Sequence, residues 1–205
     1  MPDILADLRA RDLVETVSDE GLGRVLQQTA LPFYCGFDPT APSLQLGNLC
    51  AILTMRRLQL AGHKPVAVVG GGTGMIGDPS GKNAERNLLD ETTLARNLAG
   101  QRAQLERLLD FGLGPTGAIL VNNHDWLGPF NLIAFLRDVG KRFRMGEMLA
   151  RESVKRRLES EAGLSFTEFT YQVLQAYDFL HLYQKHGVRL QIGGSDQWGN
   201  ITAGT

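Results

Sequence analysis

The feature of this sequence that most limits its fold is the alternation of short apolar runs with longer segments of helical spacing. Leucine and isoleucine recur at helical intervals over residues 47–61, 94–108 and 132–139. Strands that alternate with helices predict an α/β fold, with a parallel sheet, right-handed crossovers and helices on both faces. The four runs expected to form strands are Phe33–Phe37, Val66–Val69, Ala118–Val121 and Val188–Ile192.

The composition fits a globular domain and excludes several classes of protein. Of the 205 residues, 43% are hydrophobic, and the net charge of -1 argues against a surface that binds nucleic acid or membrane throughout. Cys35 and Cys50 are too few for a disulfide framework or a zinc site, and we expect both to be small buried residues. With no apolar run of membrane-spanning length and no secretory signal, we expect a soluble cytoplasmic protein with no membrane partner.

The two ends of the sequence differ from its middle. Residues 1–30 read as a short helical lead-in with Ile4, Leu5 and Leu8 on one face, and the main domain is expected to occupy residues 31–205. Asn200–Thr205 has the pattern of a first helical turn. We therefore expect the sequence to be a fragment of a longer chain.

Two helix starts carry capping signals. Ser165 and Glu168 have the spacing of a capping box, which predicts a long helix from there to about Lys185. Asp90 or Thr92 is expected to cap the helix that occupies residues 94–108.

Glycine is over-represented, with 24 residues, or about 12% against an average near 7%. One cluster, residues 70–81, follows an apolar run but has neither the Gly-Lys-Ser/Thr end of a P-loop nor the offsets of a dinucleotide fingerprint. Its glycines would let the backbone approach a ligand closely. Asp78 in this loop could bind an ammonium group or a ribose, or could simply cap a turn.

Two further loops follow apolar runs at the point where parallel strands place their ligands. Residues 38–48 lead into a helix whose N-terminus can accept phosphate, with Thr40, Gln45 and Asn48 as neutral donors; a capped turn fits equally well. Residues 191–200 place two glycines near an aspartate and a glutamine, which suits a nucleoside.

The long helix carries a polar stripe. Tyr171, Gln175 and Asp178 stand at i, i+4 and i+7 and share one face. An exposed polar face would explain them. A pocket lined by a phenol, an amide and a carboxylate would instead suit a small zwitterion that carries a hydroxyl group.

Taken together and in order, these segments resemble the bacterial tyrosyl-tRNA synthetases, a class I aminoacyl-tRNA synthetase family, over essentially the whole chain. The resemblance implies a Rossmann-like catalytic domain that lacks the family's second signature loop and its anticodon-binding domains. The strongest matching segments are Tyr34–Ala41, Gly77–Lys82, Phe135–Lys141, Ser165–Phe169 and Gln191–Thr202.

The resemblance implies a set of tyrosine-binding residues. Tyr34 and Asp178 would hold the phenolic hydroxyl of L-tyrosine. Asp78, Tyr171 and Gln175 would hold its ammonium group, and Gln197 would lie near its carboxylate.

The resemblance also implies ATP as a substrate, with Mg²⁺ bound to it, but no tightly bound cofactor and no resident metal. Tyrosine would be activated to tyrosyl-adenylate and then transferred to tRNA(Tyr). Catalytic roles would fall to Thr40, Gln45, Lys82 and Arg86. The residues that would contact ATP are Gly36, Asp38, Thr40, Gln45, Gly47, Asn48, Gly194 and Asp196.

One departure from the family pattern concerns the ATP signature. Where the family has His-Ile-Gly-His or a close variant, this chain has Gln45-Leu46-Gly47-Asn48. Asn48 can still donate a hydrogen bond, but Gln45 cannot become cationic, which predicts weaker support of the γ-phosphate. Two alternatives therefore stay open: a truncated or degenerate paralogue that binds tyrosine and dimerises with little catalysis, and a nucleotide-binding α/β protein with another substrate.

A basic strip runs from residue 137 to residue 157, with eight basic residues against three acidic ones. It is either a solvated helix face or, as the resemblance implies, a surface for the acceptor stem of tRNA. The residues expected to face RNA are Arg151, Lys155, Arg156 and Arg157. A homodimer contact is expected nearby, through Phe130, Leu132, Phe135 and Phe166.

Overall fold

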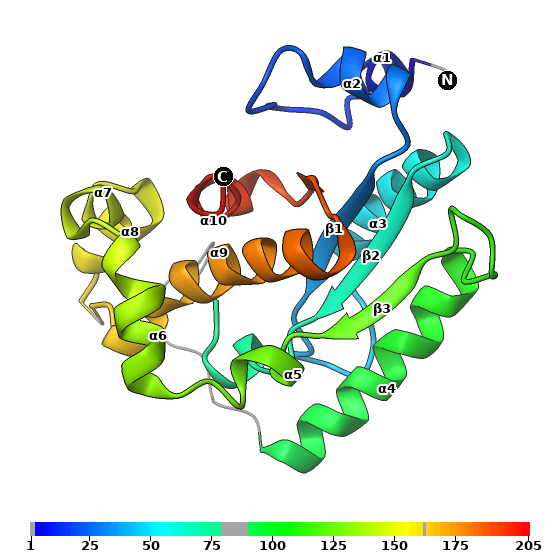
Figure 1. Cartoon of the computed structure of the whole chain (residues 1–205). Helices are drawn as coiled ribbons and strands as arrows, with labels where there is room; N and C mark the ends of the chain where they lie inside the picture. Colours follow the sequence, from blue (N-terminus) through cyan, green and yellow to red (C-terminus); the bar gives the residue numbers. More distant parts are fainter. Residues whose placement is uncertain (1–2, 79–89, 162) are drawn as a thin grey trace.

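The computed structural model describes residues 3–78, 90–161 and 163–205 and contains a four-stranded parallel sheet (Figure 1). The strand order is β3-β2-β1-β4, so the chain crosses over from one edge of the sheet to the other. This arrangement confirms the predicted α/β fold. The strands are β1 (Pro32–Phe37), β2 (Lys64–Val69), β3 (Ile119–Asn122) and β4 (Leu190–Gln191).

Helices cover both faces of the sheet. Alternate side chains of β1 point in opposite directions: Phe33 and Phe37 belong to one core cluster, with residues of α1, α3 and α4, and Tyr34 belongs to another with Leu182 of α9. Figure 1 shows α9 lying across the sheet on the side opposite α3. The helices are α1 (Ile4–Ala10), α2 (Leu22–Gln28), α3 (Leu46–Leu60), α4 (Glu91–Leu108), α5 (His124–Leu127), α6 (Leu132–Asp138), α7 (Met145–Leu149), α8 (Glu152–Leu158), α9 (Phe166–His186) and α10 (Trp198–Ala203).

The helix starts follow their capping residues. Asp90 caps α4, because its Oδ1 accepts a hydrogen bond of 2.7 Å from the backbone N–H of Thr93, so Asp90 rather than Thr92 is the cap. Ser165 and Glu168 form the predicted capping box at the start of α9. The helix ends at Gly187, which has a left-handed φ of 65° that glycine adopts at little cost.

Two expectations need correction. Cys35 is buried, and burial raises the pKa of its thiol to about 12, but Cys50 is exposed on α3. The last strand is also shorter than the apolar run that predicts it, since the backbone N–H of Val188 donates to Leu182 at the end of α9.

The N-terminal lead-in joins the main core. Ile4, Leu5 and Leu8 are buried on one face of α1, as predicted, in the same cluster as Leu26 and Phe33. The boundary at residue 30 stays a prediction.

Candidate functional site

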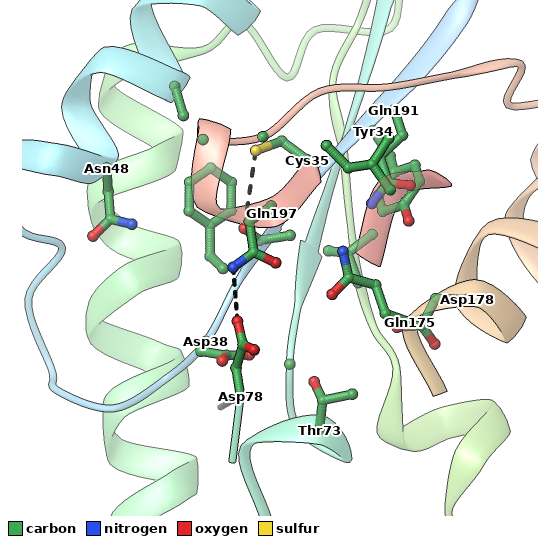
Figure 2. A pocket seen from close by; sticks show the side chains of 18 of the residues that line it. Tyr34, Cys35, Asp38, Asn48, Thr73, Asp78, Gln175, Asp178, Gln191 and Gln197 are labelled. Carbon is green, nitrogen blue, oxygen red and sulfur yellow. Dashed lines mark hydrogen bonds between the residues drawn. The ribbon is translucent and has the colours of Figure 1, made fainter. Parts of the chain in front are cut away.

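A cavity of about 910 Å³ lies at the carboxyl ends of the strands (Figure 2). It is lined from β1, from the loops after β1, β2 and β4, from the start of α3 and from one face of α9. Every predicted tyrosine-binding or ATP-binding residue lines this cavity. The predicted catalytic residues Lys82 and Arg86 lie outside the described part of the chain.

One end of the cavity contains a buried phenol and a buried carboxylate. Tyr34 is 2% exposed, and its hydroxyl has no hydrogen-bond partner among the described residues. Asp178 is also buried, and burial raises the pKa of its carboxyl to about 7. Burial, and then the charge of Asp178, raises the pKa of Tyr34. A buried polar group without a partner is costly, so this end of the cavity suits a ligand that carries a hydroxyl group.

Two residues that the sequence reasoning missed hold Asp178 in place. Asn123 donates from Nδ2 to one carboxylate oxygen at 3.0 Å, and Trp126 donates from Nε1 to the other at 2.7 Å. Both hydrogen bonds lower the pKa of Asp178, in opposition to its burial. The available signal was position, because Asn123 directly follows β3 at the sheet edge where the other loops meet.

Asn123 also fixes the glycine-rich loop. Its Oδ1 accepts a hydrogen bond of 2.8 Å from the backbone N–H of Gly72, and its Nδ2 donates to Thr73 Oγ1 at 2.9 Å. A Cβ at Gly70 would lie 2.7 Å from Asp38 Oδ1, so a larger residue there would force the Asp38 side chain to move. One buried amide therefore sets the distance between the loop after β2 and Asp178.

The middle of the cavity is acidic. The hydroxyl of Tyr171 donates to Asp38, 3.2 Å from each carboxylate oxygen, and Asp78 accepts a hydrogen bond of 2.7 Å from Gln197 (Figure 2). Burial, followed by the charges of Asp38, Asp78 and Asp178, raises the pKa of Tyr171. The three carboxyl groups near Tyr171 favour a cationic group such as ammonium.

The other end of the cavity is open. Thr40, Gln45 and Gly47 are exposed, and among the described residues no atom beyond the local backbone lies within 4 Å of where a Cβ would stand at Gly36 or Gly47. Asn48 Oδ1 accepts a hydrogen bond of 2.9 Å from the backbone N–H of Gln45 at the start of α3. This end therefore offers space, a helix N-terminus and neutral donors, which fit a nucleotide.

The loop that carries this open end is held from behind by α4. Asn97, which is 1% exposed, donates to the carbonyl oxygen of Pro39 at 2.9 Å, and Gln101 donates to that of Asp38 at 3.1 Å. Gly100 makes room between them, because a Cβ there would lie 2.1 Å from the carbonyl oxygen of Pro42. No local sequence pattern indicates this support.

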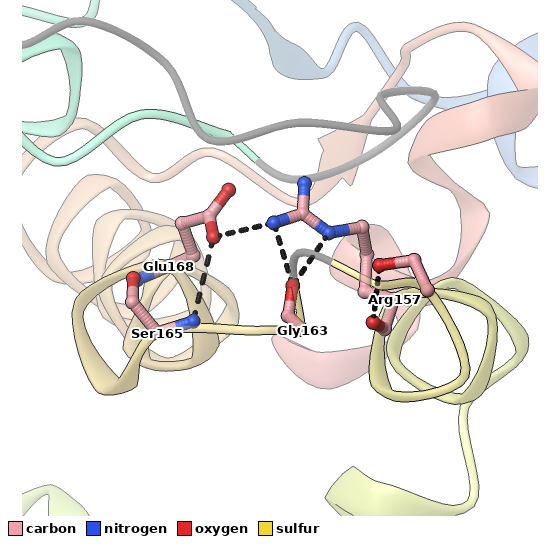
Figure 3. Close-up of polar contacts among 5 residues, drawn as sticks. Arg157, Gly163, Ser165 and Glu168 are labelled. Atoms are coloured by element: carbon pink, nitrogen blue, oxygen red, sulfur yellow. Dashed lines mark hydrogen bonds and ion pairs between the residues drawn. The ribbon is translucent and has the colours of Figure 1, made fainter.

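The basic strip divides into exposed and buried cations. Lys155 and Arg156 are exposed, whereas Arg151 is half-buried and donates to the carbonyl oxygen of Gly199. The side chain of Arg157 is only 3% exposed and pairs with Glu168 at 2.8 Å (Figure 3). The prediction that Arg157 faces RNA is therefore wrong, because its guanidinium group is buried and paired with Glu168.

Arg157 instead joins α8 to the start of α9. Its Nε and one terminal nitrogen donate to the carbonyl oxygen of Gly163 at 3.2 and 2.9 Å, beside the capping box that contains Glu168 (Figure 3). A charge run in the sequence cannot reveal which of its members turns inward.

Of the four residues expected at the dimer contact, two are exposed and two are partly buried. Leu132 and Phe166 are 67% and 77% exposed. Phe130 and Phe135 are partly buried and pack edge-to-face with each other, with ring centroids 5.3 Å apart. The exposed apolar surface of this region thus includes Phe166 and one face of α6.

Two kinds of feature are absent from the described residues. They contain no helix that is both long enough and apolar enough to span a membrane. They also contain no group of three or more histidine, cysteine, aspartate or glutamate residues arranged to hold a metal ion.

The family model described as "tRNA synthetases class I (W and Y)" matches residues 26–205. The chain is 57% identical over 205 residues to a tyrosine–tRNA ligase of Protochlamydia amoebophila, covering all of this chain and 48% of that protein. It is likewise 57% identical over 203 residues to the enzyme of Geobacillus stearothermophilus, covering 98% of this chain and 48% of that protein. The chain therefore spans about half the length of these relatives.

Solved structures agree with the sequence matches. A C-terminally truncated mitochondrial tyrosyl-tRNA synthetase of Aspergillus nidulans is similar with a TM-score of 0.91 and 32% identity, covering all of this chain and 60% of that one. A tyrosyl-tRNA synthetase of Archaeoglobus fulgidus in complex with L-tyrosine has a TM-score of 0.64 at 18% identity, covering 98% of this chain and 59% of that one. The second likeness concerns the fold alone.

Proposed function

The chain belongs to the class I tRNA synthetases for tryptophan and tyrosine, and from this premise we propose that it is the amino-acid- and ATP-binding part of a tyrosine–tRNA ligase. The observation that carries the choice of tyrosine is the Tyr34 hydroxyl, which is buried without a partner in the cavity that Asp178 also lines. A tyrosine hydroxyl can accept a hydrogen bond from Tyr34 and donate one to Asp178. An indole ring offers no oxygen for the first of these bonds.

The zwitterionic end of the substrate would lie along the acidic middle of the cavity. Asp78, Tyr171 and Gln175 would bind the ammonium group, with Asp78 held by Gln197. Gln197 would also lie near the carboxylate and direct it toward the open end. Gln191, whose Oε1 is buried without a partner among the described residues, is a further candidate for a polar contact in this cavity.

ATP would occupy the open end, with Mg²⁺ bound to its phosphates. Gly36, Asp38 and Gly47 would leave room for the nucleotide, and Gly194 and Asp196 would contact the ribose. Thr40, Gln45 and Asn48 would donate hydrogen bonds to the phosphates, and Lys82 and Arg86 would assist from the segment that follows Asp78.

The reaction would be attack of a tyrosine carboxylate oxygen on the α-phosphorus of ATP, with departure of pyrophosphate and formation of tyrosyl-adenylate. The tyrosyl group would then pass to tRNA(Tyr). No covalent intermediate with the protein is needed, so the residues of the cavity would act by positioning the reactants and stabilising charge on the α-phosphate.

We also propose a cytoplasmic homodimer. The support is the exposed apolar face of α6, which contains Leu132, Ile133 and Leu136, together with Phe166. Such a patch suits a self-complementary contact across a two-fold axis. The exposed Lys155 and Arg156, together with Arg151, would contact tRNA.

The test is pyrophosphate exchange into ATP by the full-length protein, with each amino acid in turn as the required substrate. We expect exchange with tyrosine and not with tryptophan. In a Tyr34→Phe variant, selectivity for tyrosine over phenylalanine should fall by about fivefold or more, the value of one neutral hydrogen bond. Exchange that depends on another amino acid, or on none, would refute the proposal.

A further inference from the structure

The indole of Trp126 is held between a hydrogen bond and a stacked ring. Its Nε1 donates to Asp178 Oδ1 at 2.7 Å, and its ring lies against the imidazole of His181, with centroids 4.4 Å apart and planes 14° from parallel. Asp178 and His181 stand three residues apart on α9 and so share one face of the helix. Asp178 and His181 of α9 therefore both contact Trp126 of α5.

The helix that carries Trp126 does little to fix it. α5 spans only His124–Leu127 and has no buried residue, and a helix of one turn is not stable by itself. Trp126 is half-buried and packs against the core cluster that contains Tyr34 and Val68. His181 supplies the stacked contact on the indole, and Tyr177 confines the imidazole with its ring centroid 6.3 Å away.

The direction of the indole N–H matters for Asp178. Burial raises the pKa of this carboxyl to about 7, and the hydrogen bonds from Asn123 and Trp126 act against that rise, while the charge of Asp38 adds to it. The phenols of Tyr34, Tyr171 and Tyr177 are near enough for the charge of Asp178 to raise their pKa values. Loss of the Trp126 hydrogen bond would therefore leave more of this carboxyl protonated at neutral pH.

We propose that His181 is a positioning residue for recognition of the substrate hydroxyl, because its stacked ring keeps the Trp126 N–H directed at Asp178. This inference rests on the proposed function and adds to it a residue that does not line the cavity. To act in this way, residue 181 needs a flat ring that can stack on the indole of Trp126. The pKa of His181 is lowered by burial and then by the charges of His186 and Lys185, which favours the neutral form of the stacked ring.

The experiment compares His181→Ala with His181→Phe in the full-length protein. We expect His181→Ala to raise the KM for tyrosine and lower selectivity against phenylalanine by about tenfold, the value of a weakened hydrogen bond to a charged group, with the KM for ATP unchanged. The acid limb of kcat/KM for tyrosine should move to higher pH. His181→Phe keeps a flat ring and should retain the unmodified values.

Fluorescence adds a readout that reports on the stack itself. These 205 residues contain two tryptophans, so a background in which Trp198 and any tryptophan outside them are replaced by phenylalanine leaves Trp126 as the reporter and serves as the reference for each variant. Emission of Trp126 should change as His181 protonates below its ordinary pKa, and His181→Phe should remove this component while leaving the change that accompanies protonation of Asp178. The same pH dependence of emission in the reference protein and in His181→Phe would contradict the stacked arrangement.

Three results would overturn the inference. His181→Ala could leave tyrosine KM, selectivity and pH profile unchanged, or alanine and phenylalanine could be equally damaging, or both KM values could rise together with a fall in Tm. Failure of the proposed function is a separate outcome, because it would appear as an absence of tyrosine-dependent exchange in the unmodified protein.

Discussion

The two ends of the cavity are built in opposite ways. At the closed end Tyr34, Asn123 and Asp178 are all less than 5% exposed, and both oxygens of Asp178 accept hydrogen bonds from the protein. At the open end Gln45 and Gly47 are exposed, and the neutral side chains of Thr40, Gln45 and Asn48 are available to a ligand. A rigid, dehydrated end can discriminate between substrates, because an unsatisfied polar group there is costly, whereas an exposed end cannot impose that penalty.

The strongest test of this difference is a matched pair of variants, Asp178→Asn at the closed end and Gln45→Ala at the open end. Asp178→Asn should lower selectivity for tyrosine over phenylalanine by about 10- to 100-fold, since it removes a buried charged acceptor. Gln45→Ala should leave selectivity unchanged and affect only the rate of adenylate formation. Pyrophosphate exchange with each amino acid measures both effects, and equal losses of selectivity would abolish the distinction between the ends.

The closed end should also be the source of the pH dependence of tyrosine binding. The pKa of Asp178 is raised to about 7, and a carboxylate accepts the substrate hydroxyl more strongly than a carboxylic acid does. Tyrosine affinity should therefore fall below about pH 7, by at most about tenfold per pH unit, while ATP affinity stays constant. Calorimetric titrations of each substrate between pH 5 and 8 would measure this, with Asp178→Asn as a control that should show no such limb.

The Asp178 carboxyl should also make stability depend on pH, but stability should fall as pH rises, whereas tyrosine affinity should increase. The unfolded chain loses the Asp178 proton near pH 4, whereas the folded state keeps it up to about pH 7. This group therefore makes the protein less stable as pH rises through that window. Asp178→Asn should flatten this part of the stability curve, and a steeper curve would contradict the assignment.

The sequence could predict which residues line the cavity but not what holds them. Local rules place Asp78 and Asp178, because strand ends converge at one edge and a helix repeats every 3.6 residues, whereas Tyr34 is expected in the site only from the family resemblance. The hydrogen bonds from Asn123 to Asp178 and from Asn97 to Pro39 join residues 55 and 58 positions apart. Such pairs depend on how elements pack, which no local pattern records.

The same limit explains the two wrong expectations about exposure. Cys50 stands among apolar neighbours in the sequence, yet it lies on the exposed side of α3. Arg157 belongs to a basic run, yet it turns inward because Glu168, eleven residues later, meets it at the start of α9. In both cases the residue type suggested an environment that the tertiary structure reverses.

At the open end, replacement of Gln45 by the family's histidine should raise activity. Gln45→His alone is the better variant than a double change, because Asn48 accepts the backbone N–H at the start of α3 and its loss would weaken that cap. A cationic donor near the phosphates should speed pyrophosphate exchange by the full-length protein by about fivefold, with tyrosine selectivity unchanged. An unchanged rate would mean that Gln45 already serves as well as histidine.

The smallest expected effect concerns RNA, and it applies the contrast between buried and exposed groups to two adjacent arginines. Arg156 is exposed and Arg157 is buried against Glu168, so the same loss of charge should act on binding at one position and on folding at the other. Arg156→Gln should reduce the salt dependence of binding to an acceptor-stem hairpin by about one unit of slope, the share of one phosphate contact, with no change in Tm. Arg157→Gln should lower Tm, because it leaves Glu168 as a buried charge without its partner, and should leave the salt slope of the folded fraction unchanged. Hairpin titrations at several salt concentrations would separate the two, and an equal slope for Arg156→Gln and the unmodified protein would return the exposed part of the strip to a solvated helix face.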